Sequence, residues 1–237
     1  LHDLGVRWYA PGEIGEVVPT RKTVVRVGTG RTESAPDFAT RALWLYGPEQ
    51  TRWACRNRMG HPAPMIPCGH SLHGLVRDLP GFQDGDKGRK EHPEFYNIAD
   101  GQTGWWPNLA HPEVARIFAK NAIEILRKGP ASGSPGGKQS IRSISVSPDD
   151  GYLVDDRPEV VAMNSPGREP ILGMQSFSDA WFTFLNRVCA EIDRQAPDLG
   201  SFTLGSLAYM NYVLPPRKEK PDPRIIPVIA PITFNRY

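Results

Sequence analysis

The stretch IRSISVSPDDG, residues 141–151, decides the fold prediction. Its first half predicts a buried strand, and its second half, with Pro148, Asp149, Asp150 and Gly151, predicts a polar turn. In parallel α/β folds, ligands bind in the loops at the carboxyl ends of the strands. If helices flank this strand, the stretch therefore predicts both a fold class and the place of a site.

Two amphipathic segments flank the stretch in the sequence. In the first, Pro112 suits the first position of a helix, Arg127 and Lys128 suit its negative end, and Gly129-Pro130 stops it. The second begins near Ser176 to Asp179, a capping-box spacing, carries one apolar face and ends before Pro197. Both segments predict long helices that pack by one face. A shorter helix is expected through Trp53 and Arg58.

Apolar runs between the helices predict further strands. We expect five in all, at 41–46, 72–76, 141–146, 202–209 and 225–232, and a polar loop at 81–88. Strands that alternate with helices require a mostly parallel sheet. The chain is therefore predicted to be an α/β protein, either a partial (β/α)8 barrel of the TIM type or a small open sheet.

The sequence pattern changes near Phe38. Residues 1–33, with a short predicted strand at 23–27, are interpreted as the end of a preceding accessory α/β domain, and residues 34–237 as the α/β unit proper. The chain opens at Leu1 without a signal peptide, so we expect it to be a fragment of a longer protein.

Composition excludes several classes of protein. The 28 basic and 26 acidic residues give a net charge of +2, without the basic patch that a nucleic-acid-binding protein needs. The longest nearly uncharged run, residues 225–235, is too short and too rich in proline to span a membrane. We therefore expect neither a nucleic-acid partner nor a membrane partner.

Asp149 and Asp150 are the strongest candidates for chemistry. Two adjacent carboxylates repel, so one of them can stay protonated as a general acid while the other remains an anion. The alternative is that Pro-Asp-Asp-Gly is only a favourable turn. Asp155 and Asp156 add carboxylates nearby, but the ligand spacing of an EF-hand is missing.

A zinc site is the main metal alternative, because Cys55, Cys68, His70 and His73 lie within 19 positions. The close cysteine pair that makes zinc motifs specific is missing, which favours buried cysteines and hydrogen-bonded histidines. Gly137-Lys138 does not complete a P-loop, and neither a dinucleotide fingerprint nor a G-x-S-x-G elbow occurs. The sequence therefore predicts no metal and no cofactor.

Several segments together resemble one bacterial family. They are LGVRWYAPGEIGE (4–16), RNRM (56–59), GHS (69–71), HPEFY (92–96), Asn108 with HPEV (111–114), SVSPDDG (145–151), and Ala208-Tyr209 before Pro215-Pro216. This family is catalogued as domain of unknown function 4838 and is grouped with glycoside-hydrolase-like (β/α)8 barrels, near the α-glucuronidases and hexosaminidases. The likeness covers almost the whole chain.

The resemblance implies that residue 38 onward supplies about the first five barrel strands, with the rest beyond Tyr237, and that the protein is extracytoplasmic. In hexosaminidase-like relatives, neighbouring carboxylates act as the acid and as the group that polarises a substrate acetamide. Asp149 and Asp150 resemble such a pair. Where family members carry cysteines after the Asp-Gly pair, this chain has LVDD at 153–156, which argues against a metal or disulfide there.

Asp150 is the expected acid because it directly precedes Gly151, and Asp149 is the expected polariser or orienter. Sugar-hydroxyl contacts are assigned to Arg41, His70, His73 and Tyr209. Three hypotheses follow: a glycoside hydrolase with a carbohydrate substrate, a non-catalytic carbohydrate-binding barrel, and a metal-dependent hydrolase built on the zinc set.

Overall fold

The computed structural model describes residues 2–20, 30, 33, 41, 47–59, 66–128, 132–133 and 140–230. The chain divides into two compact units, Leu1–Met65 and Ile66–Tyr237. The predicted domain boundary between residues 33 and 34 stays a prediction, because residues 34–40 lie outside the described ones.

The described residues of the N-terminal unit include a small hairpin and a helix. Strand β1 (Arg7–Trp8) pairs antiparallel with β2 (Glu16–Val17), and short 3-10 turns lie at His2–Leu4 and Glu13–Gly15. Helix α1 (Pro48–Arg56) confirms the helix expected through Trp53 but ends before Arg58. The indole Nε1 of Trp53 donates to the carbonyl of Trp8 at 2.8 Å. The predicted strand at 23–27 and most of that at 41–46 lie outside the described residues.

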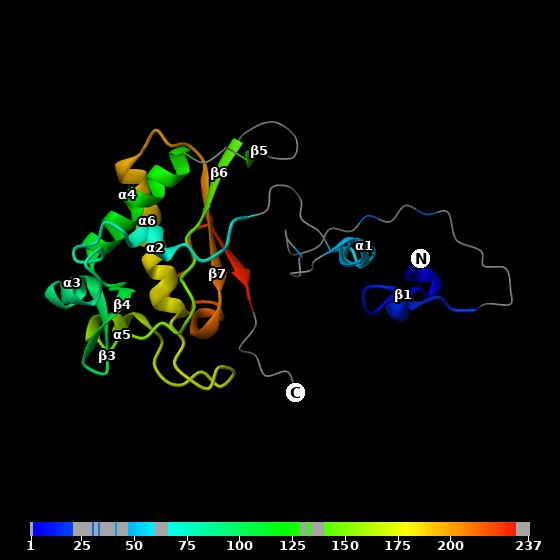
Figure 1. Cartoon of the computed structure of the whole chain (residues 1–237), viewed down its shortest axis with the longest axis horizontal. Coiled ribbons are helices and arrows are strands. Elements are labelled where there is room, and N and C mark those ends of the chain that lie inside the picture. The colour runs from blue at the N-terminus through cyan, green and yellow to red at the C-terminus, as the bar shows by residue number, and fades with distance from the viewer. Residues whose placement is uncertain are drawn as a thin grey trace. The chain divides into compact units, whose positions relative to one another are not determined.

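A four-stranded sheet organises the larger unit, and Figure 1 shows its strands side by side. Its order is β5-β6-β7-β8, with β5 (Ser132–Gly133), β6 (Ser140–Ser145), β7 (Phe202–Ala208) and β8 (Ile225–Ile229). Strands β6, β7 and β8 are parallel, and β5 is antiparallel to β6. An isolated parallel bridge joins His70 to Ser147, just beyond the carboxyl end of β6. The mixed α/β class is confirmed, and the described strands form no closed barrel.

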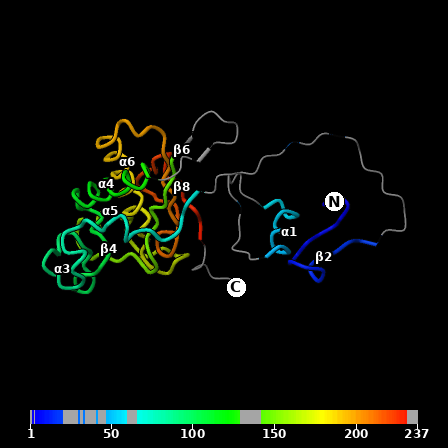
Figure 2. The backbone as a smooth tube through the Cα atoms, turned by 45° about the horizontal axis from the view of Figure 1, so that its top comes forward, coloured from blue at the N-terminus to red at the C-terminus, as the bar shows by residue number. Residues whose placement is uncertain are grey.

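The two predicted long helices are confirmed as α4 (Pro112–Lys128) and α6 (Ser178–Gln195). They pack against one another beside the sheet, as Figures 1 and 2 show. Phe118 of α4 meets Phe184 of α6 edge to face, with ring centroids 5.2 Å apart. Trp181 of α6 is fully buried and donates its indole N–H to Ser206 Oγ on β7 at 2.9 Å. This pairing fixes the helix layer to the strand whose end carries the candidate site.

The predicted strand at 72–76 is wrong, because these residues form helix α2 (Leu72–Val76). Leu72, Leu75 and Val76 are buried, which is the i, i+3, i+4 spacing of one helical face. A five-residue apolar run does not distinguish a short strand from a short helix, so the packing of its side chains in the folded protein determines which one forms. The predicted loop at 81–88 is also partly wrong, because helix α3 (Gly85–Glu91) begins within it.

A hairpin that the sequence patterns did not reveal follows the 3-10 turn at Pro93–Phe95. Strands β3 (Tyr96–Ala99) and β4 (Gln102–Pro107) pair antiparallel. Asp100 and Gly101 make the two-residue turn with φ of 49° and 71°, both in the left-handed region that such tight turns require.

Two further connections complete the described part of the larger unit. Helix α5 (Pro158–Met163) precedes α6, and a 3-10 turn (Met210–Tyr212) follows β7. Among the described residues, no helix combines the length and apolar character needed to cross a bilayer.

Candidate active site

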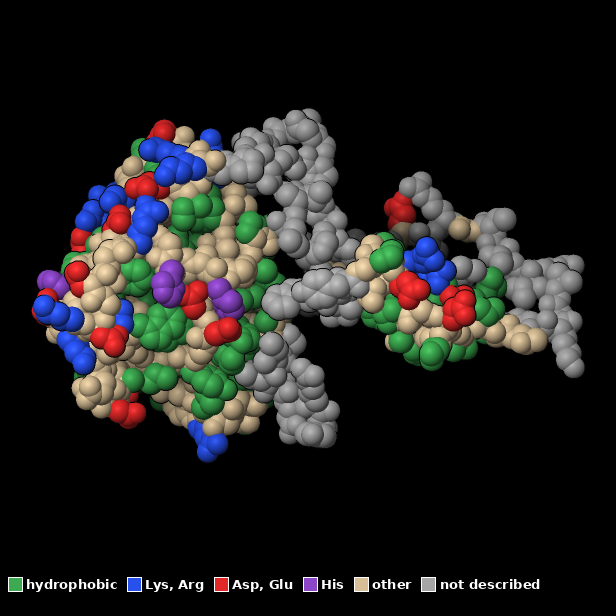
Figure 3. All heavy atoms as spheres, in the orientation of Figure 1, with side chains coloured by type: hydrophobic (Ala, Val, Ile, Leu, Met, Phe, Trp, Pro, Cys, Tyr) green, Lys and Arg blue, Asp and Glu red, His purple; other side chains and the backbone are tan. Residues whose placement is uncertain are grey.

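The loop after β6, the segment around α2 and the end of β7 bring five predicted site residues together. They are Asp149, Asp150, His70, His73 and Tyr209. Parallel pairing explains this, because the carboxyl ends of β6 and β7 and the His70 bridge lie at the same edge of the sheet. Figure 3 shows histidine and acidic side chains next to one another on this face of the larger unit.

Asp149 and His73 form the tightest pair of the cluster. His73 Nδ1 lies 2.6 Å from Asp149 Oδ2, and the Asp149 side chain is only 20% exposed. The His73 ring stacks on Trp105 with centroids 5.8 Å apart and meets the edge of Phe82 at 5.5 Å. Two aromatic contacts and one hydrogen bond therefore hold the imidazole in a fixed orientation.

His70 links the loop backbone to the second aspartate. Its Nδ1 lies 2.6 Å from the carbonyl oxygen of Pro148, which can only accept, so His70 Nδ1 carries a proton. Its Nε2 then faces Asp150 Oδ1 at 3.2 Å. When His70 is neutral, this nitrogen is an acceptor and can share a proton with the Asp150 carboxyl.

Asp150 is the accessible member of the aspartate pair, with its side chain 77% exposed. The Tyr209 hydroxyl donates to Asp150 Oδ1 at 3.2 Å. Burial, followed by the charge of Asp150, raises the pKa of Tyr209, so this hydroxyl keeps its proton for the hydrogen bond. Tyr212, fully buried behind Tyr209, has its pKa raised mainly by burial, and no described residue partners its hydroxyl.

Buried hydrogen bonds hold the Asp149–Asp150 loop at both ends. Before it, Ser147 Oγ donates to the carbonyl of Cys68 at 2.7 Å and accepts from Leu207 N at 2.8 Å. After it, the Asn211 amide accepts from Leu153 N at 3.0 Å and donates to Leu153 O at 2.7 Å. Gly151 turns the chain between these anchors with φ of 124°, a conformation that L side chains rarely adopt.

Asp155 and Asp156 serve the hairpin and not the cluster. Asp155 Oδ1 accepts from Ile98 N at 3.3 Å, and Asp156 Oδ2 accepts from Asp100 N at 2.7 Å. Burial raises the pKa of Asp155, although hydrogen bonds from the backbone of Arg157 and Ile98 oppose the shift. These contacts tie the chain beyond the site loop to the hairpin that carries Trp105.

Arg41 and Cys55 belong to the N-terminal unit, whereas the cluster is formed by residues of the larger unit. Within the described ranges, no three His, Cys, Asp or Glu side chains are grouped to hold a metal ion. Cys68 is half-buried, and burial raises the pKa of its thiol, which disfavours the thiolate that zinc requires. The zinc alternative therefore has no support from these side chains.

The sequence patterns missed three parts of the site: Phe82, Asn211 and the Pro148 carbonyl. Phe82 lies in a segment predicted only as a polar loop. Asn211 comes two residues after Tyr209, but an asparagine after a strand carries no local signal of the buried partner it will meet. A backbone carbonyl that accepts a hydrogen bond cannot be predicted from residue type, because every residue has one.

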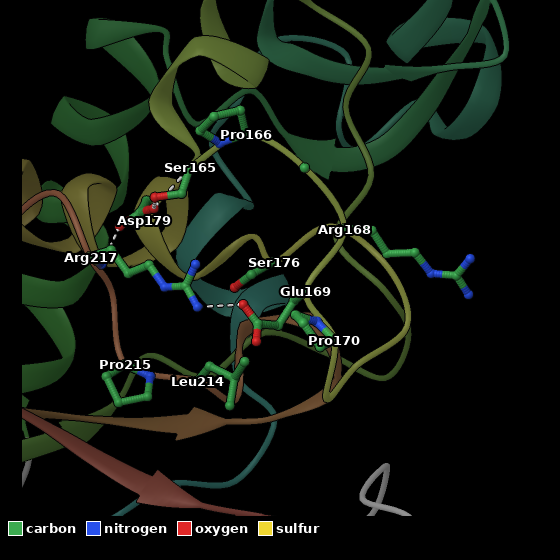
Figure 4. A pocket seen from close by; sticks show the side chains of 11 residues that line it. Ser165, Pro166, Arg168, Glu169, Pro170, Ser176, Asp179, Leu214, Pro215 and Arg217 are labelled. Carbon is green, nitrogen blue, oxygen red and sulfur yellow. Dashed lines mark hydrogen bonds and ion pairs between the residues drawn. The ribbon is translucent and has the colours of Figure 1, made fainter.

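A separate pocket lies where the chain beyond α5 meets the chain beyond β7. This pocket, of about 60 Å³, is lined among others by Glu169 and Arg217, whose side chains form an ion pair at 2.5 Å. Figure 4 shows this pair beside Asp179, which bonds to Ser165. The acidic groups at this pocket are engaged within the protein, which indicates a structural role.

The family model described as domain of unknown function (DUF4838) matches residues 9–237. The chain belongs to this family. No curated protein matches the chain, and no solved structure does.

In this DUF4838 protein, the two aspartates of the cluster have different surroundings. The Asp150 carboxyl, accessible to solvent, lies 3.2 Å from His70 Nε2 and accepts a hydrogen bond from Tyr209. The Asp149 carboxylate, largely sheltered, accepts from His73. Two adjacent carboxylates in different surroundings are the arrangement that separates an acid from an anion.

Proposed function

We propose that this DUF4838 protein is a glycoside hydrolase that acts on a polysaccharide or glycan. Asp150 is the general acid that protonates the leaving oxygen, and Asp149 is the neighbouring polariser or orienter. The convergence of both aspartates with two histidines and a tyrosine at the carboxyl ends of β6 and β7 carries the proposal. The cluster places one accessible carboxyl group, Asp150, and one sheltered carboxyl group, Asp149, beside two histidines and a tyrosine.

The surroundings of the cluster suit a sugar. Trp105 is partly buried and stacks on His73 with ring centroids 5.8 Å apart, and aromatic rings are platforms for the apolar faces of sugars. Tyr152, next to Gly151, is exposed and adds a further aromatic ring on the site loop. We assign sugar-hydroxyl contacts to His70 and Tyr209.

The larger unit is proposed to be part of a (β/α)8 barrel, and the protein is proposed to work outside the cytoplasm. Three parallel strands, the additional parallel bridge at His70 and the helices α4 and α6 support the barrel assignment. The placement of the cluster at carboxyl ends of strands is typical of barrel enzymes.

A non-catalytic carbohydrate-binding protein is the second candidate. The exposure of the Asp150 side chain, at 77%, favours it, because the carboxylic acids that protonate leaving groups in glycosidases are typically sheltered from water. The two functions differ in one observable result, since a binding protein retains the glycan without cleaving it.

The test is hydrolysis of a panel of aryl glycosides, including N-acetylhexosaminides and glucuronides, by the full-length protein and by Asp150→Asn. Asp86→Asn is the matched control, because Asp86 is exposed and pairs only with Arg89 on its own helix. We expect hydrolysis by the wild type and the control, and a loss of at least about 100-fold in Asp150→Asn. Glycan binding without hydrolysis by the wild type would establish the second candidate instead.

A further inference from the structure

We propose that His73 is the general base of this site, and that Asp149 is a positioning residue that acts through it. The inference rests on the proposed glycosidase function and deepens it, because it assigns the group that activates water. It also predicts a single displacement with inversion at the anomeric carbon.

The hydrogen-bond geometry fixes which nitrogen of His73 can act. Asp149 Oδ2 lies 2.6 Å from His73 Nδ1, and a carboxylate only accepts, so the proton of a neutral imidazole resides on Nδ1. The lone pair is then on Nε2, on the opposite side of the ring. A carboxylate that holds Nδ1–H also stabilises the imidazolium that forms when Nε2 takes a proton.

The surroundings leave Nε2 accessible and the ring immobile. The His73 side chain is 70% exposed, and no described residue hydrogen-bonds its Nε2. Stacking on Trp105 and the edge contact with Phe82 restrict rotation of the ring. A fixed base with one open nitrogen is the geometry that a water molecule needs for activation.

His70 cannot take this role, although it also carries its proton on Nδ1. Its Nδ1 is bonded to the Pro148 carbonyl, a neutral acceptor, and its Nε2 faces Asp150 at 3.2 Å. The two histidines therefore differ: Nε2 of His70 faces the proposed acid, and Nε2 of His73 has no hydrogen-bond partner among the described residues.

The reaction balances with these groups alone. His73 Nε2 takes one proton from water as the water oxygen bonds to the anomeric carbon, and the glycosidic C–O bond breaks. The proton of Asp150 goes to the leaving oxygen. The products are a free sugar and an alcohol, and the imidazolium of His73 and the carboxylate of Asp150 exchange the proton through solvent before the next cycle.

Asp149 is the charged group in direct contact with His73, and the His70–Asp150 pair lies in the same cluster. Just after helix α2, Arg77 and Asp78 are paired with Glu124 and Lys120 of α4. The carboxylate of Asp149 is therefore the charge that orients the His73 ring.

The first test follows the aryl glycoside that the wild-type full-length protein hydrolyses. We expect His73→Gln to lower kcat by at least about 100-fold with KM changed less than about threefold. The control His92→Gln is expected to behave as the wild type. The first-formed sugar, observed by proton NMR, should have the inverted configuration.

Two outcomes separate the inference from the function on which it rests. Hydrolysis with retained configuration, or kcat of His73→Gln within about threefold of wild type, overturns the role of His73 and leaves the glycosidase standing. Absence of hydrolysis by the wild type overturns both.

A second measurement does not depend on activity. Nitrogen-15 NMR of the imidazoles should show neutral His73 protonated on Nδ1 in the wild type, with that preference lost in Asp149→Asn. His111 is the internal control, because its Nδ1 accepts from Glu113 N at 3.2 Å and it must carry the opposite tautomer. Protonation of neutral His73 on Nε2 in the wild type would refute the proposal.

Discussion

Replacement of Asp179 by asparagine should destabilise the larger unit strongly, although it changes no heavy-atom volume. Asp179 is buried at the start of α6 and accepts four hydrogen bonds. Its Oδ2 accepts from Ser165 N at 2.9 Å and Ser165 Oγ at 2.6 Å, and its Oδ1 accepts from the backbone of Arg217 at 2.6 Å and Lys218 at 2.8 Å. Each oxygen therefore serves two donors.

The magnitude follows from this count. If the asparagine NH₂ group turns toward Arg217 and Lys218, two backbone donors lose their acceptor. If it turns toward Ser165, the hydroxyl can reverse and accept, and only Ser165 N loses its acceptor. Each unsatisfied buried donor costs about 1–3 kcal/mol, so we expect a loss of about 2 kcal/mol. With a urea m-value of about 2 kcal/mol/M, the midpoint of unfolding should fall by about 1 M.

The loss should also depend on pH. Burial opposes ionisation of Asp179, but the hydrogen bonds from Ser165, Lys218 and Arg217 together outweigh it and hold its pKa below the ordinary 3.8. A lowered pKa contributes stability that is present above the unfolded value and is lost as pH falls through the folded value. The difference in free energy of unfolding between wild type and Asp179→Asn should therefore be largest at pH 7 and decrease below pH 3.8.

Urea unfolding followed by far-ultraviolet circular dichroism measures the effect, because α4 and α6 dominate the helix signal. Asp86→Asn is again the matched control and should stay within about 0.5 kcal/mol of wild type, because Asp86 is exposed. A loss in Asp179→Asn no larger than that of the control would refute the reasoning.

Three further predictions concern the support of the site. Gly205→Ala should lower the free energy of unfolding in urea by about 3 kcal/mol or more, because a Cβ there would lie 1.8 Å from Pro67 O. A stability equal to that of the wild type would contradict this packing. Asn211→Ala should cost about 2–3 kcal/mol, since both backbone groups of Leu153 lose their partner, and unchanged hydrogen exchange at Leu153 N would argue against it. Burial raises the pKa of Asp155, so its ionised form destabilises the folded protein at neutral pH, and this destabilisation decreases as the pH falls. The free energy of unfolding of Asp155→Asn relative to wild type should therefore be more favourable at pH 7 than at pH 4. A difference that does not depend on pH would contradict this prediction.

Local sequence determined the elements whose signals lie within one turn or one strand. Helix α4 runs from Pro112 to Lys128, where the proline, the acidic start, the basic end and the following Gly-Pro predict it. The strand 141–146 and its polar turn were likewise readable, and the carboxyl-end rule placed Asp149 and Asp150 at a sheet edge. The capping-box spacing at Ser176 correctly predicted where α6 begins, but the capping box itself does not form. Asp179 accepts hydrogen bonds from Ser165, Arg217 and Lys218 and not from the residue at the start of the predicted box.

Tertiary structure decided the partners within the site. His73 was predicted on a strand and lies on helix α2, where it meets an aspartate 76 positions away in the sequence. His70 meets the Pro148 carbonyl across 78 positions, and Tyr209 meets Asp150 across 59. Hydrogen-bond partners at such separations are chosen by strand pairing and by the packing of α2 against α4, which no local periodicity encodes. The sequence by itself therefore determined which groups could do chemistry, and only the folded chain decided which nitrogen faces which carboxylate.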